Sequence, residues 1–111
     1  MSYRIAVASS DGKVVNQHFG HTRQFLVFEV EADGKWSFKE MRNTEPACGV
    51  NEHSTSSMSQ AVGLLSDCRA VIVSQIGFGA RQALGEKGIQ AYEMPVLIHS
   101  ALKEVAALQP Q

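Results

Sequence analysis

One stretch in the second half of the chain, residues 70–93, reads AVIVSQIGFGARQALGEKGIQAYE and sets the architecture. Residues 70–73 form a short, continuous apolar run, which is typical of a buried strand. A tight loop with two glycines follows over 74–79, and a helix is predicted around 80–87, closed by the next glycine. Residues 89–93 then resume as a strand. A strand, a helix and a second strand in this order predict a parallel crossover and the α/β class.

The first half of the chain contains strand patterns without a helix between them. Residues 5–8 (IAVA) are again continuously apolar and predict a buried central strand, and residues 25–30 are rich in aromatic and β-branched side chains. Asp33-Gly34 is a strong hairpin signal. Beyond it, Trp36 and Phe38 alternate with lysines and a serine. This period of two predicts a half-buried strand at the edge of the sheet.

Two further helices complete the pattern. One is predicted from its apolar residues at helical spacing: Met58, Ala61, Val62 and Leu65. The other is predicted to start at Pro95, with one apolar face formed by Ile98, Ala101, Leu102, Val105 and Leu108. Residues 43–53 carry no period. The resulting order, three strands and then two helix–strand alternations followed by a final helix, predicts a mixed sheet covered by helices.

The length of 111 residues predicts a single domain over residues 1–111. With 44% hydrophobic residues the chain has enough apolar material for a core, which excludes a disordered protein. A formal net charge of −1 argues against partners among nucleic acids and membranes. No apolar run approaches the ~20 residues of a membrane helix, and the N-terminus lacks the shape of a signal peptide. The two cysteines are therefore expected to be reduced thiols in the cytoplasm.

Ligands of such sheets bind outside the carboxyl ends of the parallel strands. Three segments are expected there: residues 9–19, 74–79 and 93–95. Loops at this place, held by a rigid sheet, are where site residues are expected.

The first of these loops ends in the run Asn16-Gln17-His18-Phe19-Gly20-His21. A neutral imidazole such as that of His18 is either a metal ligand or a hydrogen-bonding group. On residue type alone, a turn-capping role in contact with the backbone is the favoured interpretation of His18. His21 is the weaker candidate, because the Thr22-Arg23 pair after it is typical of a solvated turn.

A second candidate lies in the aperiodic stretch that contains Cys48 and His53. Thiolate and imidazole both ligate soft or borderline metals. One C-x4-H pair is short of the four ligands of structural zinc, however, and two cysteines cannot supply a four-cysteine iron–sulfur site. The stretch is therefore either a functional loop or a loop with a free thiol. Cys68, at the entry to a buried strand, is predicted to be a small core residue.

The third candidate is the run Gly77-Phe78-Gly79-Ala80-Arg81-Gln82 between a strand and a helix. Glycines there let backbone N–H groups approach an anion. A dinucleotide fingerprint would have a third glycine where Gln82 stands, although Glu93 is placed to bind a ribose. A small regulatory domain that binds a nucleotide or anion at residues 77–81 therefore stays open. The plainer interpretation is that these glycines form a tight turn.

Motifs of common enzyme classes are absent from the sequence, among them G-x-S-x-G, H-E-x-x-H and the P-loop. The first and fourth predicted strands carry no carboxylate, so a two-metal nuclease site lacks its ligands. We expect a protein that is not an enzyme.

Several motifs follow one another in a specific order along nearly the whole chain: residues 5–9 with Asp11-Gly12, residues 16–20, residues 25–30, Arg42 before the Pro46/Cys48/His53 loop, and residues 71–73 with Ile76-Gly77 and Gly88-Ile89. In this order they resemble the dinitrogenase iron–molybdenum cofactor biosynthesis family, small cluster-binding accessory proteins of nitrogenase cofactor assembly. The resemblance implies a ribonuclease-H-like three-layer fold without nuclease activity. Its five-stranded mixed sheet has the order 3-2-1-4-5, with strand 2 antiparallel and helices on both faces.

The resemblance also implies non-catalytic binding and delivery of a preformed cluster. The implied cargo is an iron–sulfur cluster, a precursor of the iron–molybdenum cofactor or another molybdenum–sulfur cluster. Its metal would be met by His18, Cys48 and His53, and the surface around it would be formed by Ser9, Asn16, Gly77, Phe78, Gly79 and Arg81. The implied partners are the proteins that donate and accept the cluster, with the chain itself a monomer or a weak homodimer. A module that binds other proteins through the sheet edge near Trp36 is a further alternative.

Overall fold

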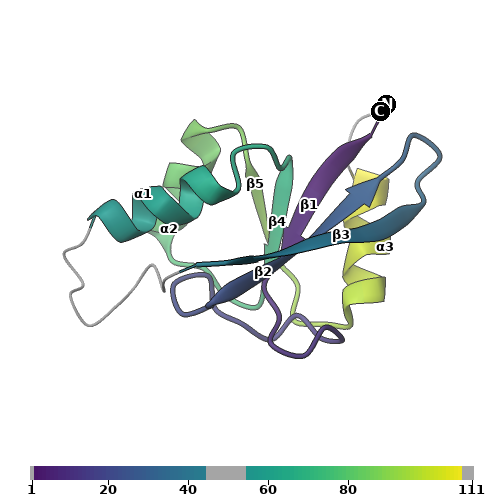
Figure 1. The fold of residues 1–111 in the computed structure, drawn as a ribbon, viewed down its shortest axis with the longest axis horizontal. Coiled ribbons are helices and arrows are strands. Elements are labelled where there is room, and N and C mark those ends of the chain that lie inside the picture. The colour runs from purple at the N-terminus through teal and green to yellow at the C-terminus, as the bar shows by residue number, and fades with distance from the viewer. Residues whose placement is uncertain (1, 45–54, 109–111) are drawn as a thin grey trace.

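The computed structural model describes residues 2–44 and 55–108. Figure 1 shows their arrangement as a sheet with helices packed against it. Along the chain the elements are β1 (Tyr3–Val7), β2 (Gln24–Val30), β3 (Trp36–Asn43), α1 (Thr55–Leu64), β4 (Ala70–Val73), α2 (Phe78–Glu86), β5 (Gln90–Glu93) and α3 (Ile98–Leu108). This is the order of strands and helices that the sequence predicts.

The five strands form one mixed sheet in the order β3-β2-β1-β4-β5. β1 pairs in parallel with β4, and β4 pairs in parallel with β5. β2 runs antiparallel to both of its neighbours, β1 and β3. The predicted sheet order and the antiparallel second strand are therefore confirmed. The carboxyl ends of β1, β4 and β5 consequently lie at one edge of the molecule, where the candidate loops follow them.

Alternating side chains of the strands form two separate apolar cores. In β1, Ala6 belongs to the core with α1 and α2, whereas Ile5 and Val7 belong to the core with α3. Figure 1 shows the same layers, with α1 and α2 together on one side and α3 on the other. Strands that are apolar on both faces are needed for this arrangement, which explains why β1 and β4 are continuously apolar. The predicted helices on both faces of the sheet are thus present.

The last helix starts later than the sequence predicts. It begins at Ile98 rather than at Pro95. The carbonyl oxygen of Val96 accepts a hydrogen bond from the N–H of Val15 at 2.9 Å, and the N–H of Ile98 donates to the carbonyl of Lys13 at 2.8 Å. These bonds hold the segment after β5 against the loop after β1, so the chain turns helical only beyond them.

Two smaller expectations about the helices also need correction. Leu108, predicted on the buried face of α3, is 59% exposed because it is the last residue of the helix. α2 begins at Phe78, two residues before the predicted start. Within the described residues, no helix has the length and apolar character needed to cross a bilayer.

β3 is an edge strand, as predicted, but its alternation is interrupted. Phe38 pairs with Phe28 and Glu40 pairs with Val27, so Lys39 is an extra residue. One extra residue in a strand is a β-bulge, which bends the strand and shifts the phase of its side chains. Trp36 is half-buried as expected, but Phe38 is 56% exposed. The expectation that both rings are half-buried is therefore wrong for Phe38, because Trp36 packs against the core on the α3 side and Phe38 does not.

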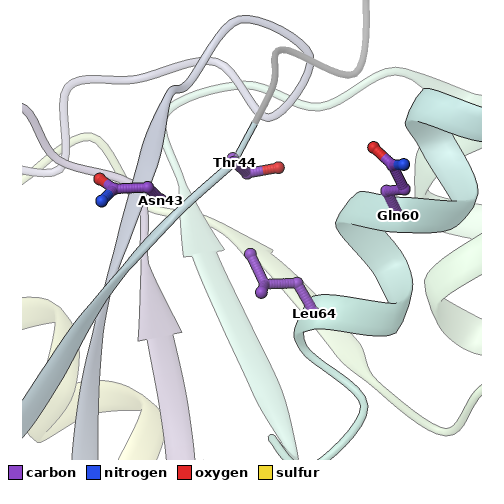
Figure 2. A pocket seen from close by; sticks show the side chains of 4 residues that line it. All are labelled: Asn43, Thr44, Gln60 and Leu64. Atoms are coloured by element: carbon purple, nitrogen blue, oxygen red, sulfur yellow. The ribbon is translucent and has the colours of Figure 1, made fainter.

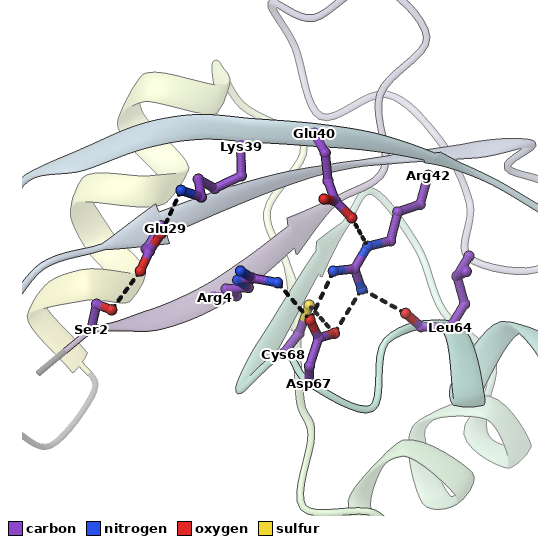
Figure 3. A network of polar contacts seen from close by, with 9 residues as sticks. All are labelled: Ser2, Arg4, Glu29, Lys39, Glu40, Arg42, Leu64, Asp67 and Cys68. Atoms are coloured by element: carbon purple, nitrogen blue, oxygen red, sulfur yellow. Dashed lines mark hydrogen bonds and ion pairs between the residues drawn. The ribbon is translucent and has the colours of Figure 1, made fainter.

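Arg42 ties this edge strand to the segment that leads into β4 (Figure 3). Its guanidinium donates two hydrogen bonds to the Asp67 carboxylate, at 2.6 and 2.8 Å, and one to the carbonyl of Leu64 at 2.7 Å. Glu40 accepts from Arg42 Nε at 2.6 Å, and Arg4 donates to Asp67 at 2.9 Å. The hydrogen bonds from Arg42 hold the pKa of Asp67 well below its usual range. The network is thus a cross-link between β1, β3 and the end of α1.

Candidate functional site

The loops that follow β1 and β4 run side by side at the carboxyl edge of the sheet. His18 forms a parallel bridge with Gln75, and the N–H of Phe19 donates to the carbonyl of Gln75 at 2.9 Å. The structure therefore brings His18 next to the loop that leads to Gly77–Gly79. Neighbouring parallel strands end at the same edge, so the topology alone explains this meeting.

The first loop begins with a turn around Ser9, which is fully buried. The Ser9 hydroxyl donates to Asp11 Oδ1 at 3.1 Å and accepts from the N–H of Gly12 at 3.0 Å. Asp11 Oδ1 also accepts the N–H groups of Lys13 and Val14, and these bonds lower the pKa of the Asp11 carboxyl. The hydroxyl of Ser9, a predicted binding residue, is therefore engaged within the turn. It shapes the loop from beneath the surface.

Asn16 closes the same loop. Its Oδ1 accepts the N–H of Ser10 at 3.0 Å, and its Nδ2 donates to the Ser10 hydroxyl at 3.1 Å. Asn16 itself is exposed. This predicted binding residue thus holds the shape of the loop from its outer side and remains accessible to a ligand.

The orientation of the His18 ring is set by Gly20, whose N–H donates to His18 Nδ1 at 2.9 Å. A neutral imidazole that accepts at Nδ1 carries its proton on Nε2. His18 therefore presents an N–H donor on the side of the ring away from Gly20. A metal bond through Nε2 would need the proton on Nδ1, where it would face the Gly20 N–H. Ligation at Nε2 thus costs the Gly20 hydrogen bond.

A second histidine lies directly against the first. The N–H of His21 donates to the carbonyl of His18 at 3.0 Å, and this tight turn places the two ring centroids 4.8 Å apart at an interplanar angle of 85°. From the sequence His21 is the weaker candidate, yet the structure puts both imidazoles in one place. In the sequence, the pair could have been found from two histidines three positions apart in a loop, with Gly20 between them.

A polar pocket of about 290 Å³ adjoins this histidine pair. Its walls are Ser9, Ser10, Gln17 and residues 21–24. Gln24 joins two parts of this lining, since its side-chain amide donates to the carbonyl of Ser9 at 2.8 Å. Arg23 is the one cation among these wall residues, so the pocket favours an anionic guest.

The glycine loop beyond β4 leads directly into α2. Gly77 is the N-cap residue and supplies no side-chain cap. The first N–H groups of a helix lack partners within the helix and favour negative charge. Phe78, in the first turn, is 81% exposed. Gly77, Phe78 and Gly79 thus present backbone donors and one large apolar ring at the surface.

Arg81 and Glu93, both considered for ligand binding, contact each other and backbone groups of other residues. Arg81 donates to the carbonyl of Ala91 at 3.1 Å and lies 3.5 Å from Glu93 Oε1. Glu93 Oε2 accepts the N–H of Ile76 at 2.9 Å. Glu93 is therefore already engaged, which argues against the ribose-binding role. The Arg81 side chain remains 46% exposed, so part of its guanidinium faces solvent.

The structure describes one of the two cysteines, Cys68. Cys48 and its predicted companion His53 lie outside the described residues. Cys68 is a buried core residue, as predicted, and burial raises the pKa of its thiol to about 12. It precedes β4 and so lies at the opposite edge of the sheet from His18. Within residues 2–44 and 55–108, no group of three or more His, Cys, Asp and Glu side chains is placed to hold a metal ion.

Two other pockets differ from the first in their lining. One, of about 480 Å³, lies between the end of β3 and α1 and is lined by Asn43, Thr44, Gln60 and Leu64 (Figure 2). None of these side chains is charged. The other, of about 400 Å³, is a mainly apolar groove beside α3 that includes Phe28, Trp36 and Leu102, with Lys13 and His99 also in its lining. The carboxyl edge of the sheet is therefore the described place where imidazoles, an arginine and free backbone donors come together.

Comparison with known proteins identifies relatives over nearly the whole chain. The model of the family described as dinitrogenase iron-molybdenum cofactor matches residues 1–108. FeMo cofactor biosynthesis protein NifB of Frankia alni is 37% identical over 107 residues, which are 93% of this chain and 21% of that protein. Protein NifX of Klebsiella pneumoniae is 30% identical over 94 residues, 85% of this chain and 58% of that protein. This chain thus spans about a fifth of the NifB relative.

The fold is also found among solved structures. The crystal structure of PH0822 superposes with a TM-score of 0.70 at 21% identity, and the match covers 97% of this chain and 92% of that one. At this identity the likeness shows a shared fold and nothing of the site.

Proposed function

The chain belongs to the dinitrogenase iron–molybdenum cofactor family, whose model spans residues 1–108, and on that premise we propose that it binds and delivers a preformed metal–sulfur cluster. Relatives are named for FeMo cofactor biosynthesis. The cargo is an iron–sulfur cluster, a precursor of the iron–molybdenum cofactor or another molybdenum–sulfur cluster. The partners are the proteins that hand over the cluster and those that receive it.

The observation that carries this proposal is the histidine pair at the carboxyl edge of the sheet. His18 and His21 lie 4.8 Å apart between their ring centroids, beside an open polar pocket and the loop that leads into α2. Imidazole is both a ligand for metals and a donor to sulfide. The pair can thus offer a cluster both a bond to a metal and a hydrogen bond to a sulfide.

Few protein ligands suit a carrier. The sulfides of a preformed cluster already bridge its metals, so the protein need supply only one or two bonds, and a cargo held by few bonds can leave again. A site with one imidazole pair and no group of three ligands among the described residues is consistent with such loose binding.

The proposal gives separate roles to the metal-binding side chains and to the groups that balance charge. His18 contacts the cluster first, as an Nε2–H donor to sulfide or, after its proton moves to Nδ1, as a metal ligand. Backbone N–H groups of Phe78 and Gly79 and the guanidinium groups of Arg23 and Arg81 balance the negative charge of the cluster. Cys48 and His53, which lie between β3 and α1 in the sequence, are proposed as additional metal ligands.

The proposal is limited to binding and transfer, without catalysis. NifB of Frankia alni is nearly five times as long as the matched segment, so what the whole relative does is not assigned to this chain. We also assign the three layers to the ribonuclease-H-like type, since the sheet order with β2 antiparallel is the one that type implies.

A nucleotide or anion at the Gly77–Arg81 loop is the weaker alternative. The side chains that would bind a nucleotide already contact other groups of the protein. Glu93 accepts a hydrogen bond from the N–H of Ile76 and forms an ion pair with Arg81. A free phosphate would need only the N–H groups at the start of α2.

The proposal is tested by anaerobic mixing of the purified protein with isolated iron–molybdenum cofactor, followed by gel filtration. We expect iron, molybdenum and sulfide to co-elute with the protein in the ratio of the intact cofactor, and to move to a cofactor-free dinitrogenase on mixing. ATP and inorganic phosphate, titrated by calorimetry in parallel, are expected to give no heat of binding. Nucleotide binding together with a colourless, metal-free eluate would favour the alternative instead.

A further inference from the structure

The outer edge of β3 is a long unpaired strand edge. β3 has eight residues and pairs with β2 on one side, while no strand within the described residues pairs with the other side. The other edge strand, β5, has four residues. Unpaired N–H and C=O groups along an edge are a template for a further strand. The outer edge of β3 is therefore available to pair with a strand of another chain.

The bulge in β3 gives this edge a continuous apolar side. Phe38 lies opposite Phe28 and Met41 lies opposite Leu26, and both of these partners belong to the α3 side of the sheet. In a regular strand, residues three apart would face opposite sides. The extra residue Lys39 brings Phe38 and Met41 onto one side, where they are 56% and 50% exposed.

We propose that β3 pairs in antiparallel fashion with β3 of a second copy of this chain, about a two-fold axis between Lys39 and Glu40. In this register Lys39 faces Glu40 of the partner subunit, and Phe38 faces Met41 of the partner subunit. By symmetry each contact occurs twice. Opposite charges and apolar side chains directly across two strands each stabilise the pairing.

The position of the bulge makes the two copies compatible. Because the axis passes through the bulge, the side chains that face α3 in one copy meet side chains that face α3 in the other. Phe38 and Met41 of both copies would then form one apolar cluster on that side. A two-fold contact of this self-complementary type closes on itself as a dimer.

Charge also selects this register over its neighbours. A shift by one residue places Lys39 opposite the partner's Lys39, or Glu40 opposite the partner's Glu40. Like charges directly opposite each other destabilise a strand pair. The charges of Lys39 and Glu40 therefore favour this register and disfavour the two registers that differ from it by one residue.

Contacts within the chain do not block this pairing. Lys39 lies 3.1 Å from Glu29 Oε1, and Glu40 lies 2.6 Å from Arg42 Nε. Lys39 and Glu40 are nevertheless 44% and 50% exposed, so both side chains are accessible to a partner strand. One strand pair is at the low end of specific interfaces, so the dimer is expected to depend on protein concentration.

Two charge reversals test the proposal. Lys39→Glu gives two acidic residues at the axis, and Glu40→Lys gives two basic residues. Each variant alone places like charges across the two-fold axis, but a mixture of the two places opposite charges across it. Sedimentation equilibrium over a range of concentrations measures the dissociation constant of each sample. Lys103→Glu, an exposed position on α3, is the matched control, and circular dichroism checks that every variant is folded.

We expect the wild-type protein and Lys103→Glu to dimerise alike. Each single reversal should raise the dissociation constant about tenfold, and an equimolar mixture should restore dimers. The proposal is overturned by a wild-type protein that stays monomeric throughout, by reversals that dimerise as the wild type does, or by a mixture that fails to associate. Retained folding of the variants separates these outcomes from misfolding.

Discussion

The hydrogen bond from Gly20 to His18 Nδ1 decides which ring nitrogen of His18 meets a cargo. We predict that unloaded His18 is the Nε2–H tautomer, because Nδ1 is the acceptor. Nitrogen-15 chemical shifts of the imidazole distinguish the two tautomers at a pH where the ring is neutral. On loading, a metal bond through Nε2 would convert His18 to the Nδ1–H form, whereas a donor role would leave the tautomer unchanged. An unloaded ring in the Nδ1–H form would contradict the geometry.

The Arg42–Asp67 pair is a second single-residue feature with a measurable effect. Arg42→Ala removes two hydrogen bonds to Asp67 and one to Leu64, and we expect it to lower the free energy of unfolding by about 1–2 kcal/mol. The estimate is modest because Asp67 is 44% exposed. Arg42→Lys keeps the charge without the paired geometry and should recover only part of the loss. Urea denaturation at neutral pH measures all three proteins.

The same pair predicts a pH dependence with a definite sign. The pKa of Asp67 is lowered in the folded state by Arg42, so its stabilising effect is complete above the unfolded carboxyl pKa of about 4 and is lost as the pH falls further. Wild type and Arg42→Ala should therefore converge in stability as the pH drops below about 4. A difference that stays constant down to pH 2 would mean that Asp67 does not carry the effect.

The place of His18 at the carboxyl edge of the sheet could be predicted from the sequence, because the loop after a buried parallel strand lies there. Its contact with His21 could not. The contact between His18 and His21 depends on a tight turn, and the contact between Arg42 and Asp67 joins residues 25 positions apart. Neither a turn conformation nor a distant partner is visible in local spacing.

At the scale of elements, we make a prediction about Gly88, the glycine that ends α2, with Gly85 as the matched control. Gly88 has a φ of +77°, which L side chains rarely adopt, and its N–H donates to the carbonyl of Gly85 at 3.0 Å. Gly88→Ala should lower the free energy of unfolding by about 1 kcal/mol. Gly85 lies inside the helix with open space around its α-carbon, so Gly85→Ala should be neutral or stabilising by up to ~0.5 kcal/mol. Thermal unfolding compares them, and equal losses would contradict this assignment of strain.

The strands were predictable and the start of the last helix was not, for one physical reason. Continuous apolar runs such as residues 70–73 report burial on both faces directly. The start of α3 instead depends on hydrogen bonds from Val15 and to Lys13, which belong to a loop 80 residues earlier in the chain. The bulge at Lys39 is also a property of two strands, since it is defined by what β2 presents opposite β3.

At the scale of the whole molecule, the burial of Cys68 predicts its reactivity. Cys68 is 5% exposed and burial raises the pKa of its thiol to about 12, so little thiolate is present at neutral pH. We expect a bulky alkylating reagent to label Cys68 slowly under native conditions and rapidly in urea, while Cys48 is expected to label rapidly in both. Mass spectrometry of digested protein follows each site. Faster labelling of Cys68 than of Cys48 would argue against Cys48 as an accessible ligand.

The site is assembled by topology, since no single segment contains it. The parallel pairing of β1 with β4 places His18 against Gln75. The order of the strands was within reach of the sequence, through the alternation of strands and helices and through the resemblance to a family. The atomic roles of Ser9, Glu93 and Arg81 were not, because they follow from hydrogen bonds that exist only once the loops meet.

The central claim, that the histidine pair holds a preformed cluster, is tested most directly by anaerobic loading of three single variants with the same isolated iron–molybdenum cofactor. After gel filtration, metal and sulfide retained per chain should fall about tenfold for His18→Ala and less for His21→Ala, which loses only the neighbouring ring. His99→Ala is the control, because that ring contacts Trp36 on the α3 side of the sheet, and it should retain as much as the wild type. Equal retention in all three variants would contradict the account and place the cargo elsewhere on the protein.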